Sequence, residues 1–135
     1  MLLVDSSVWI DIARTVASDA TRFLAARDET DDLATTGVIA QEVLQGFRND
    51  RHFEAWRVKF WGMRILEPRE LSTYEVAADL HRRARAKGLT IRKPNDCLIA
   101  ALALEHGALV IHNDRDFTAL AQVEPALLVY PGRPH

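Results

Sequence analysis

The sequence has 135 residues, 48% of them apolar and 27% charged, which is the balance of a globular domain with its own core. No apolar run approaches the roughly 20 residues that cross a bilayer. We therefore expect a cytoplasmic protein with no membrane contact, folded as one domain over residues 1–135. The single cysteine, Cys97, excludes a disulfide framework and a cysteine-built zinc site, and the net charge of −2 argues against attraction of nucleic acid by the whole surface.

The chain opens on an apolar run, Leu2–Val4, that leads directly into Asp5 and two serines. The run is too short for a membrane span and has no basic leader, so we interpret it as a buried strand of a parallel sheet. Asp5 would then stand at the carboxyl end of that strand, with Ser6 or Ser7 capping the helix that follows. In open α/β sheets, ligands bind at that edge.

Helical and strand patterns alternate through the rest of the chain. An acidic break at 28–32 precedes the second strand, a capping-box pattern at Ser72 and Glu75 predicts the start of a long helix, and Gly88 and Gly107 are expected to end helices. In chain order we expect helices over 8–13 and 19–28, a strand at 33–36, helices over 37–47 and 49–62, a strand at 64–67, helices over 72–87 and 96–106, a strand at 109–111, a helix that follows 113–116 and runs to about 121, and a strand at 127–130.

This alternation indicates an α/β fold. We expect a three-layer α/β/α sandwich whose central, mostly parallel sheet has four to five strands, with helices on both faces. No internal repeat, low-complexity segment or linker interrupts the pattern. Acids that follow different strands would therefore meet at one edge of the sheet.

Several acids stand at positions where a surface residue would be unusual. They are Asp5 at the end of the first strand, Glu42 inside a helix between apolar neighbours, Asp96 in the first turn of a helix, and Asp114 at the end of the fourth strand, with Asp116 two residues further on. Carboxylates held within a few ångströms repel one another unless a cation lies between them. Oxygen ligands without clustered His or Cys select Mg²⁺ or Mn²⁺. Many enzymes that hydrolyse phosphodiester bonds use a divalent ion held by carboxylates.

Each acid also has a purely structural explanation. Asp5 could cap the following helix, Glu42 could be a solvated helix residue, and Asp96 could favour the helix N-terminus through the macrodipole. Asp114 and Asp116 could form a turn with a helix cap. These explanations are independent of one another, whereas a single metal site accounts for all the acids together.

Four segments around the acids are LVDSSVWI at residues 3–10, EVLQG at 42–46, NDCLIAA at 95–101 and HNDRDF at 112–117. In their order and spacing they closely resemble PIN-domain proteins and, among these, the VapC toxins of type II toxin–antitoxin pairs. The resemblance covers the whole chain and implies a PIN-like fold. It also implies an endoribonuclease, dependent on Mg²⁺ or Mn²⁺, that cuts RNA such as tRNA, rRNA or mRNA. The implied partners are a cognate VapB-type antitoxin that blocks the site, a second toxin subunit in a homodimer, and a hetero-oligomer with the antitoxin.

The resemblance also assigns roles to the acids. The family's catalytic quartet falls on Asp5, Glu42, Asp96 and Asp114, with Asp116 as an accessory acid at the metal. Asp5 and Asp96 would be the principal ligands of the ion, and Asp114 would contribute directly or through water. Glu42 would position or deprotonate the attacking water, or help to hold a second ion. Because water is the nucleophile, we expect products with 5′-phosphate and 3′-hydroxyl ends.

Two polar residues accompany this quartet. Ser6 matches the family's hydroxyl beside the first acid. Asn113 stands where the family usually has Thr or Ser, and its amide can still orient a water or a phosphate.

RNA must approach an acidic site, so positive charge is required near it. The stretch from 81 to 93 holds six basic residues and no acid, and we predict that they contact RNA phosphates: Arg82, Arg83, Arg85, Lys87, Arg92 and Lys93. The alternative is a solvated helix face. Because the last two residues of this set directly precede the helix of Asp96, we favour the RNA interpretation.

Other functions share part of this pattern. A PIN-like RNA-processing or 5′-nuclease-type enzyme outside a toxin–antitoxin system has the same acids, although DNA-cutting 5′-nucleases are longer and carry helical arches. A receiver-like Mg²⁺-binding signalling domain would need an aspartate after the third strand and a lysine after the fifth, where this chain has Glu67-Pro68 and Tyr130-Pro131. A non-catalytic PIN-like binding module typically loses acids, and none is missing here.

Overall fold

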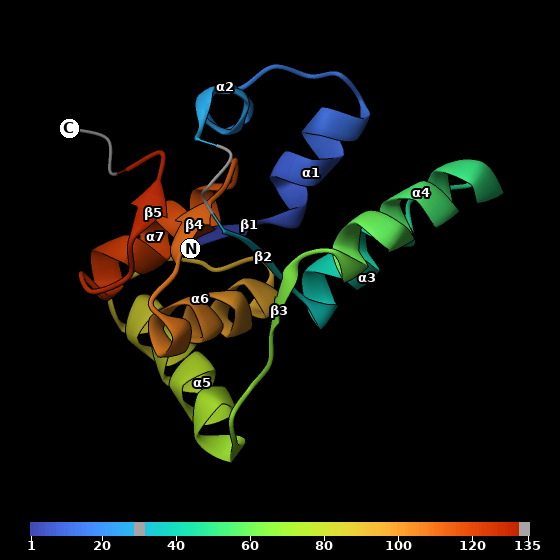
Figure 1. Ribbon diagram of the computed structural model, residues 1–135. Helices are drawn as coiled ribbons and strands as arrows, with labels where there is room; N and C mark the ends of the chain where they lie inside the picture. The colour runs from blue at the N-terminus through green and yellow to red at the C-terminus, as the bar shows by residue number, and fades with distance from the viewer. Residues whose placement is uncertain (29–31, 133–135) are drawn as a thin grey trace.

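The computed structural model describes residues 1–28 and 32–132, so the middle of the predicted acidic break and the last three residues lie outside the description. Five parallel strands form one sheet in the order β3-β2-β1-β4-β5, with helices on both sides of it (Figure 1). In chain order the elements are β1 (Leu2–Val4), α1 (Ser6–Ala13), α2 (Asp19–Ala26), β2 (Leu33–Thr36), α3 (Gly37–Leu44), α4 (Asp50–Trp61), β3 (Arg64–Leu66), α5 (Leu71–Ala86), α6 (Pro94–His106), β4 (Leu109–Ile111), α7 (Arg115–Val123) and β5 (Val129–Tyr130).

β1 is the central strand, and its sequence explains this position. Leu2, Leu3 and Val4 are at most 7% exposed, as expected for a strand that is covered on both faces. Leu3 pairs with Ala34 of β2 on one side and with Val110 of β4 on the other. The residues that follow β1 and β4 therefore lie next to each other at the carboxyl edge of the sheet.

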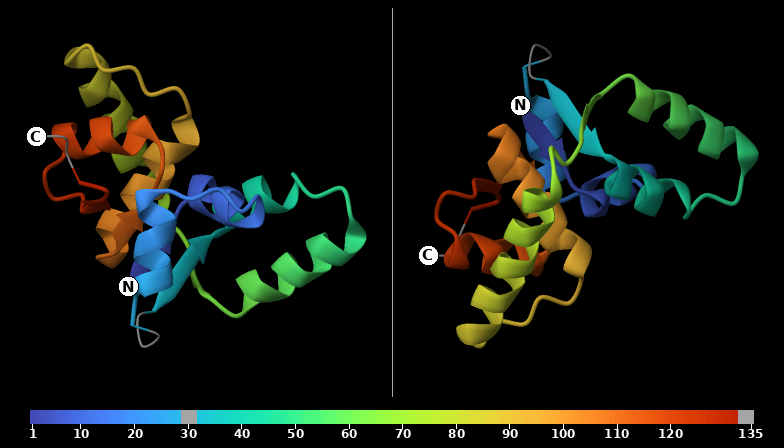
Figure 2. Two further views of the ribbon diagram at one scale, coloured as in Figure 1. Left: turned by 90° about the horizontal axis from the view of Figure 1, so that it is seen from above. Right: turned by 90° about the horizontal axis from the view of Figure 1, so that it is seen from below.

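The helices form two layers. α5, α6 and α7 pack against one another on one side of the sheet, while α1, α2 and α3 lie on the other side, and α4 extends away beyond α3 (Figure 1 and Figure 2). The predicted three-layer α/β/α sandwich with a parallel sheet is therefore confirmed. No helix in the described part of the chain has the length and apolar character needed to cross a membrane.

Most element boundaries agree with the sequence pattern to within two or three residues, but the predicted N-caps of α1 and α5 are wrong. α1 is capped by the side chain of Asp5, which accepts a hydrogen bond from the Ser7 backbone N–H, so neither serine is its cap. α5 begins at Leu71, one residue before the capping-box pattern, and has no side-chain cap. Ser72 is already inside the first turn, and its hydroxyl donates to Glu70 instead.

Candidate metal centre

The carboxyl ends of β1 and β4 bring together acids that are far apart in the sequence. The backbone N–H of Asp5 donates to the carbonyl of Ile111 at 2.9 Å, which ties the first acid to the end of β4. Asp114 follows β4 and caps α7, where its side chain accepts a hydrogen bond from the Asp116 backbone N–H at 2.9 Å. Asp96 comes from the first turn of α6. Strand ends and helix N-termini thus meet at this edge.

Three of the carboxylates form a compact group. Oxygen atoms of Asp96, Asp114 and Asp116 all lie within 4.8 Å of one another. Asp96 and Asp116 are only 2% and 1% exposed, and the side chain of Asp114 is 5% exposed. Oxygens that bind one cation at about 2.0–2.6 Å lie at such separations from each other. These acids are therefore the core of the candidate metal centre.

Asp5 adjoins this group without belonging to it. One carboxylate oxygen, Oδ2, accepts hydrogen bonds from the backbone N–H and the hydroxyl of Ser7, at 3.1 and 2.6 Å. The other oxygen, Oδ1, is buried and has no hydrogen-bond partner. Burial raises the pKa of Asp5, against the lowering effect of the Ser7 bonds, and the charge of Asp114 adds to the rise. Asp5 thus caps α1 through Oδ2, and its Oδ1 remains available for another partner.

Glu42 reaches the same site from α3. Its side chain is partly buried, and Oε1 is a buried atom without a hydrogen-bond partner. Burial raises the pKa of Glu42, the charges of Asp5 and Asp114 raise it further, and Lys93 lowers it. Glu42 therefore interacts electrostatically with the acids that follow β1 and β4, although it belongs to the opposite helix layer from α6 and α7.

The buried oxygens without partners test whether a cation fits this site. Such atoms occur on Asp5 (Oδ1), Glu42 (Oε1), Asp96 (Oδ2) and Asp116 (Oδ1). A buried carboxylate oxygen without a donor is costly, and several together repel one another, so the arrangement favours a positive charge among them. The candidate ligands are all oxygens, which suits a hard divalent cation better than zinc. The residues present fit such an ion.

The loop before α6 supplies positive charge and backbone donors to the acids. The Lys93 ammonium lies 2.8 Å from Asp114 Oδ2, and the backbone N–H groups of Arg92 and Lys93 each donate to Asp116 Oδ2 at 3.1 Å. The Arg92 guanidinium lies 3.9 Å from both Asp114 and Asp116. This loop therefore orients one acid and partly neutralises another.

These contacts give the acids different charge behaviour. Burial, and then the charges of Asp5 and Asp114, raise the pKa of Asp96. Burial also acts to raise the pKa of Asp114, but the hydrogen bonds from Lys93 and from the Asp116 backbone outweigh it and lower that pKa. Asp96 therefore carries much of the electrostatic cost of the cluster, and Asp114 is the acid that Lys93 keeps ionised.

The hydroxyl that contacts the first acid belongs to Ser7, for which the sequence pattern indicates only a possible role as a helix cap. Ser6 is buried next to Asp5. Ser7 Oγ also accepts a hydrogen bond from the Asn113 backbone N–H at 3.1 Å, so one side chain links the ends of β1 and β4. The Asn113 amide donates to Asp11 at 2.9 Å and is thereby tied to α1. The signal for Ser7 was the N-cap position of Asp5, since a cap side chain bonds to the first turn of its helix.

His112 is a second residue at the site with a structural role. It is 3% exposed, its Nε2 lies 3.0 Å from the carbonyl of Pro131, and its Nδ1 accepts a hydrogen bond from the Asp114 backbone N–H at 3.1 Å. Burial lowers the pKa of His112, which favours the neutral ring. Because both ring nitrogens are engaged, His112 holds the backbone of Asp114 in place and is not a metal ligand.

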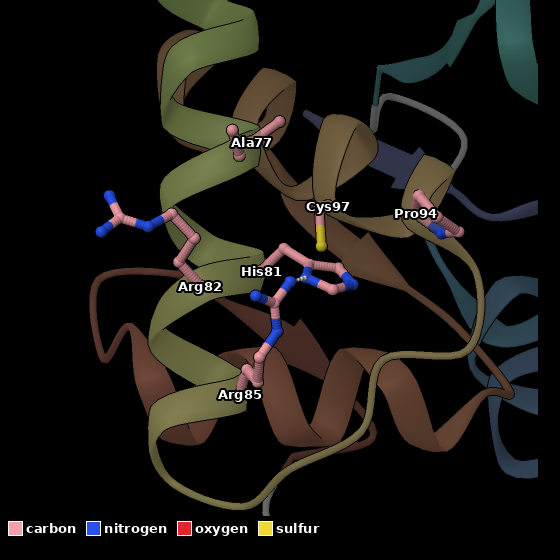
Figure 3. Close-up of a pocket in the computed structure, with 7 residues that line it drawn as sticks. Ala77, His81, Arg82, Arg85, Pro94 and Cys97 are labelled. Atoms are coloured by element: carbon pink, nitrogen blue, oxygen red, sulfur yellow. Dashed lines mark hydrogen bonds between the residues drawn. The ribbon is translucent and has the colours of Figure 1, made fainter.

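The basic residues predicted to contact RNA do not form one continuous surface. Arg92 and Lys93 border the acids, as described above. Arg82 and Arg85 line a pocket between α5 and the start of α6 (Figure 3). Arg83 instead donates to the carbonyl of Val123 at 2.7 Å, toward α7, and Lys87 is the exposed C-cap residue of α5.

A parallel five-stranded sheet with a carboxylate cluster at its carboxyl edge defines the class of protein. The model of the PIN domain matches residues 2–123, and the chain belongs to the PIN domain family. Among curated proteins, it is similar to VapC ribonuclease Mb1587 of Mycobacterium bovis. The two are 35% identical over 127 residues, which cover 91% of this chain and 93% of that protein.

Solved structures share the fold. The chain matches VapBC-1 from nontypeable Haemophilus influenzae with a TM-score of 0.71, over 95% of both chains and at 18% identity. It matches a toxin–antitoxin complex from Klebsiella pneumoniae with a TM-score of 0.72, over 99% of this chain and 100% of the other, at 20% identity. At such identities the likeness concerns the fold alone.

Proposed function

We propose that this protein is a VapC-type toxin, an endoribonuclease that hydrolyses phosphodiester bonds in RNA with the help of Mg²⁺ or Mn²⁺. The observation that carries the proposal is the group of acids whose buried oxygens lack hydrogen-bond partners, at the carboxyl edge of a PIN-domain sheet. The relative from Mycobacterium bovis, which aligns with nearly the whole chain, is itself named a VapC ribonuclease. In this proposal the chain is a single PIN domain that works in the cytoplasm.

The chain's own contribution to ion binding is to hold carboxylates in fixed positions. Asp96, Asp114 and Asp116 would hold the ion, and Asp5 would join them through Oδ1. A bound divalent ion supplies Lewis acidity and neutralises charge that builds up on the phosphate. Ser7 fixes Asp5, and the backbone just before α6 fixes Asp116. Groups fixed in advance need no reorganisation when the substrate arrives.

Glu42 is the acid that remains to accept a proton, because this proposal assigns Asp5, Asp96, Asp114 and Asp116 to the ion. Its pKa is raised by burial and by its acidic neighbours, and a carboxylate with a raised pKa is a stronger base than an ordinary one. We assign to Glu42 the orientation of the attacking water and the acceptance of its proton at Oε1. Because water is the nucleophile and the ribose 2′-hydroxyl is not, the products carry 5′-phosphate and 3′-hydroxyl ends.

Arg92 and Lys93 are the first candidates for contacts with RNA phosphates. Their side chains are 51% and 50% exposed beside the acids, so each can reach a phosphate that approaches this edge of the sheet. Arg82, Arg85 and Lys87 lie further along α5 and are separate candidates for phosphate contacts. Contacts of this kind contribute affinity that falls with salt, and no reading of sequence.

A VapB-type antitoxin is the proposed partner. Solved structures that share the fold include those of VapBC-1 and of a toxin–antitoxin complex. We propose that the antitoxin blocks the acidic edge of the sheet, and that the chain forms a homodimer and a hetero-oligomer with the antitoxin.

RNA cleavage tests the function directly. The purified protein is incubated with tRNA and rRNA in Mn²⁺, in Mg²⁺ and in EDTA, beside Asp96→Asn and the control Asp19→Asn, which removes an exposed acid paired with Arg22 on α2. We expect cleavage only with the ions, an unchanged rate for Asp19→Asn, and a loss of about 100-fold or more for Asp96→Asn. Cleavage that survives both EDTA and Asp96→Asn, or products with 2′,3′-cyclic phosphate ends, would contradict the proposal.

A further inference from the structure

Beside the acids lies a pocket for which the proposed chemistry has no use. It lies between α5 and the first turn of α6 and has a volume of ≈ 340 Å³ (Figure 3). Small-ligand sites range over about 300–1,000 Å³, so this pocket has room for one small group. Its lining combines small or apolar side chains with basic ones and includes no acid. The lining residues are Ala77, Ala78, His81, Arg82, Arg85, Pro94 and Cys97.

Two of the basic side chains of the pocket, His81 and Arg85, contact each other, and the third, Arg82, lies apart from them. The ring of His81 extends from α5 toward Cys97, and the Arg85 guanidinium approaches the same ring (Figure 3). Arg85 Nη2 lies 3.2 Å from His81 Nδ1. A guanidinium can only donate, so Nδ1 accepts and Nε2 carries the proton of the neutral ring. The guanidinium of Arg82 points away from Cys97, toward the outer side of α5 (Figure 3).

The pocket shares the first turn of α6 with the metal centre. Pro94 and Cys97 line the pocket, and Asp96 lies between them in the sequence. Cys97 is 2% exposed, and burial, followed by the charges of Asp96 and Asp116, raises the pKa of its thiol to about 11. The same turn of helix therefore presents Asp96 to the acids and Cys97 to the pocket.

We propose that this pocket receives one unpaired base of the RNA substrate, next to the phosphodiester bond that is cut. The inference rests on the proposed ribonuclease function and extends it from phosphate contacts to a base contact. Proteins that bind unpaired bases stack them on Arg planes and His rings and hydrogen-bond their edges. Arg85 and His81 supply the planar groups and a donor, Ala78 and Pro94 supply apolar contact, and Arg82 lies where a neighbouring phosphate can reach it. Since a base inside a duplex cannot enter, the substrate is a loop, a bulge or a single strand.

Two phenylalanine variants separate the pocket from its surroundings. Ala78 is exposed on α5 and lines the pocket, so Ala78→Phe fills it without disturbing the core. Val76 is 44% exposed on the same helix and does not line the pocket, so Val76→Phe adds a ring elsewhere. Thermal melts of both variants serve as the control for folding. Should Ala78→Phe melt early, His81→Ala with Arg85→Ala tests the same α5 wall of the pocket by removing its ring and its guanidinium.

The substrate for the test is a short unpaired oligoribonucleotide that spans a mapped cleavage site, with one base at a time replaced by an abasic ribose. Under single-turnover conditions with Mn²⁺, we expect one position beside the cut bond at which base removal slows the wild type and Val76→Phe about 10-fold. On the intact RNA, Ala78→Phe should cleave more slowly than the wild type by a similar factor. Removal of the base should not slow this variant any further.

The outcomes distinguish this inference from the proposed function. If the wild type cuts RNA but Ala78→Phe matches Val76→Phe, or if no single base matters, the pocket inference is overturned and the ribonuclease function stands. If the wild type cuts no RNA with either ion, the function itself fails and the base site fails with it. Fluorescence anisotropy of the same RNA on Asp96→Asn, with and without Ala78→Phe, gives a second readout that needs no cleavage. Equal affinity of the two proteins would also overturn the inference.

Discussion

Lys93 separates the acids of the site into two kinds. Asp114 accepts a 2.8 Å hydrogen bond from the Lys93 ammonium and has a lowered pKa in spite of its burial. Asp96 is buried close to Asp5 and Asp114, and its pKa is raised. Removal of one negative charge should therefore have opposite effects on the stability of the metal-free fold, depending on which acid loses it.

In EDTA, Asp96→Asn should raise the free energy of unfolding at pH 7 by about 1–3 kcal/mol. Burial raises the pKa of Asp96 to about 9, so at pH 7 the wild type must take up a proton on folding that the asparagine variant does not need. Since the pKa of Asp96 is higher in the folded state than in the unfolded state, its ionisation destabilises the fold. The gain from the substitution should thus be absent well below pH 4 and grow as the pH rises toward the folded-state pKa. Urea unfolding followed by circular dichroism between pH 4 and 8 measures it.

Asp114→Asn is the matched comparison for this prediction. The pKa of Asp114 is lowered in the folded state, so its ionised form stabilises the fold above the unfolded-state pKa and this contribution is lost as the pH falls through the folded-state value. The variant should be less stable than the wild type at pH 7 by about 1 kcal/mol. If both variants lose stability equally, the difference between the two acids that we derive from Lys93 is wrong.

At the scale of single elements, some strands were readily predictable because a short apolar run precedes a helical pattern. Leu2–Val4 and Leu109–Ile111 are examples, and both form parallel strands. Helix starts were harder to predict, because several polar residues in a row can each act as a cap. At the start of α5, Thr73 donates instead to Glu105, which lies 32 residues away on α6. Tertiary contacts of this kind decide which residue begins the helix, and no local pattern contains them.

The site could be predicted from the sequence only in part, for a similar reason. Asp5 and Asp114 were recognisable because each follows an apolar strand, and parallel strands end at one edge. The linking role of Ser7 depends on Asn113, which is 106 positions away. The separation of the basic residues into different surfaces likewise depends on which side of α5 meets α6 and α7. Spacing along the chain identifies the ligands, but it does not identify what holds them.

Gly107 allows a test of an element boundary. It ends α6 with a φ of +68°, in the left-handed region, and its N–H donates to the carbonyl of Ala103. Gly107→Ala should lower the free energy of unfolding by about 1 kcal/mol, because an L side chain is strained there. No atom lies within 4 Å of the added Cβ, so the effect comes from the backbone.

Gly37→Ala is the control for that measurement. Gly37 is the first residue of α3, and a Cβ there also meets no atom within 4 Å, but the position has no positive φ. The substitution should be neutral or stabilising by up to about 1 kcal/mol. Thermal denaturation of both variants measures the difference. Equal effects at the two positions would show that backbone conformation is not the cause.

At the scale of the whole molecule, the candidate metal centre lies where the two helix layers meet. Asp5 and Glu42 reach it from β1 and α3, while Asp96 and Asp116 reach it from α6 and α7. An ion held by carboxylates from both layers would connect them through the edge of the sheet. Ion binding should therefore stabilise the entire fold rather than one loop.

Mn²⁺ should raise the melting temperature of the wild type by about 10 °C when the free ion is at about 100 times its Kd, since linkage then adds about 2.7 kcal/mol. Asp96→Asn should lose most of this shift, because it removes a ligand, and Asp19→Asn should keep it. Differential scanning fluorimetry over a range of Mn²⁺ concentrations gives the three curves. A shift of the same size in all three proteins would mean that the ion binds elsewhere.

The first turn of α6 fixes a spacing along the RNA. Asp96 and Cys97 are neighbours on one helix, facing the acids and the base pocket, and a helical turn rises only 5.4 Å. A base held in that pocket and the bond cut at the acids must then be close neighbours in the RNA chain. The separation of the two sites on α6 is fixed. Cleavage should therefore fall at a constant number of nucleotides from the captured base, whichever RNA carries it. In unrelated RNAs, removal of the base at that same distance from the cut bond should slow cleavage.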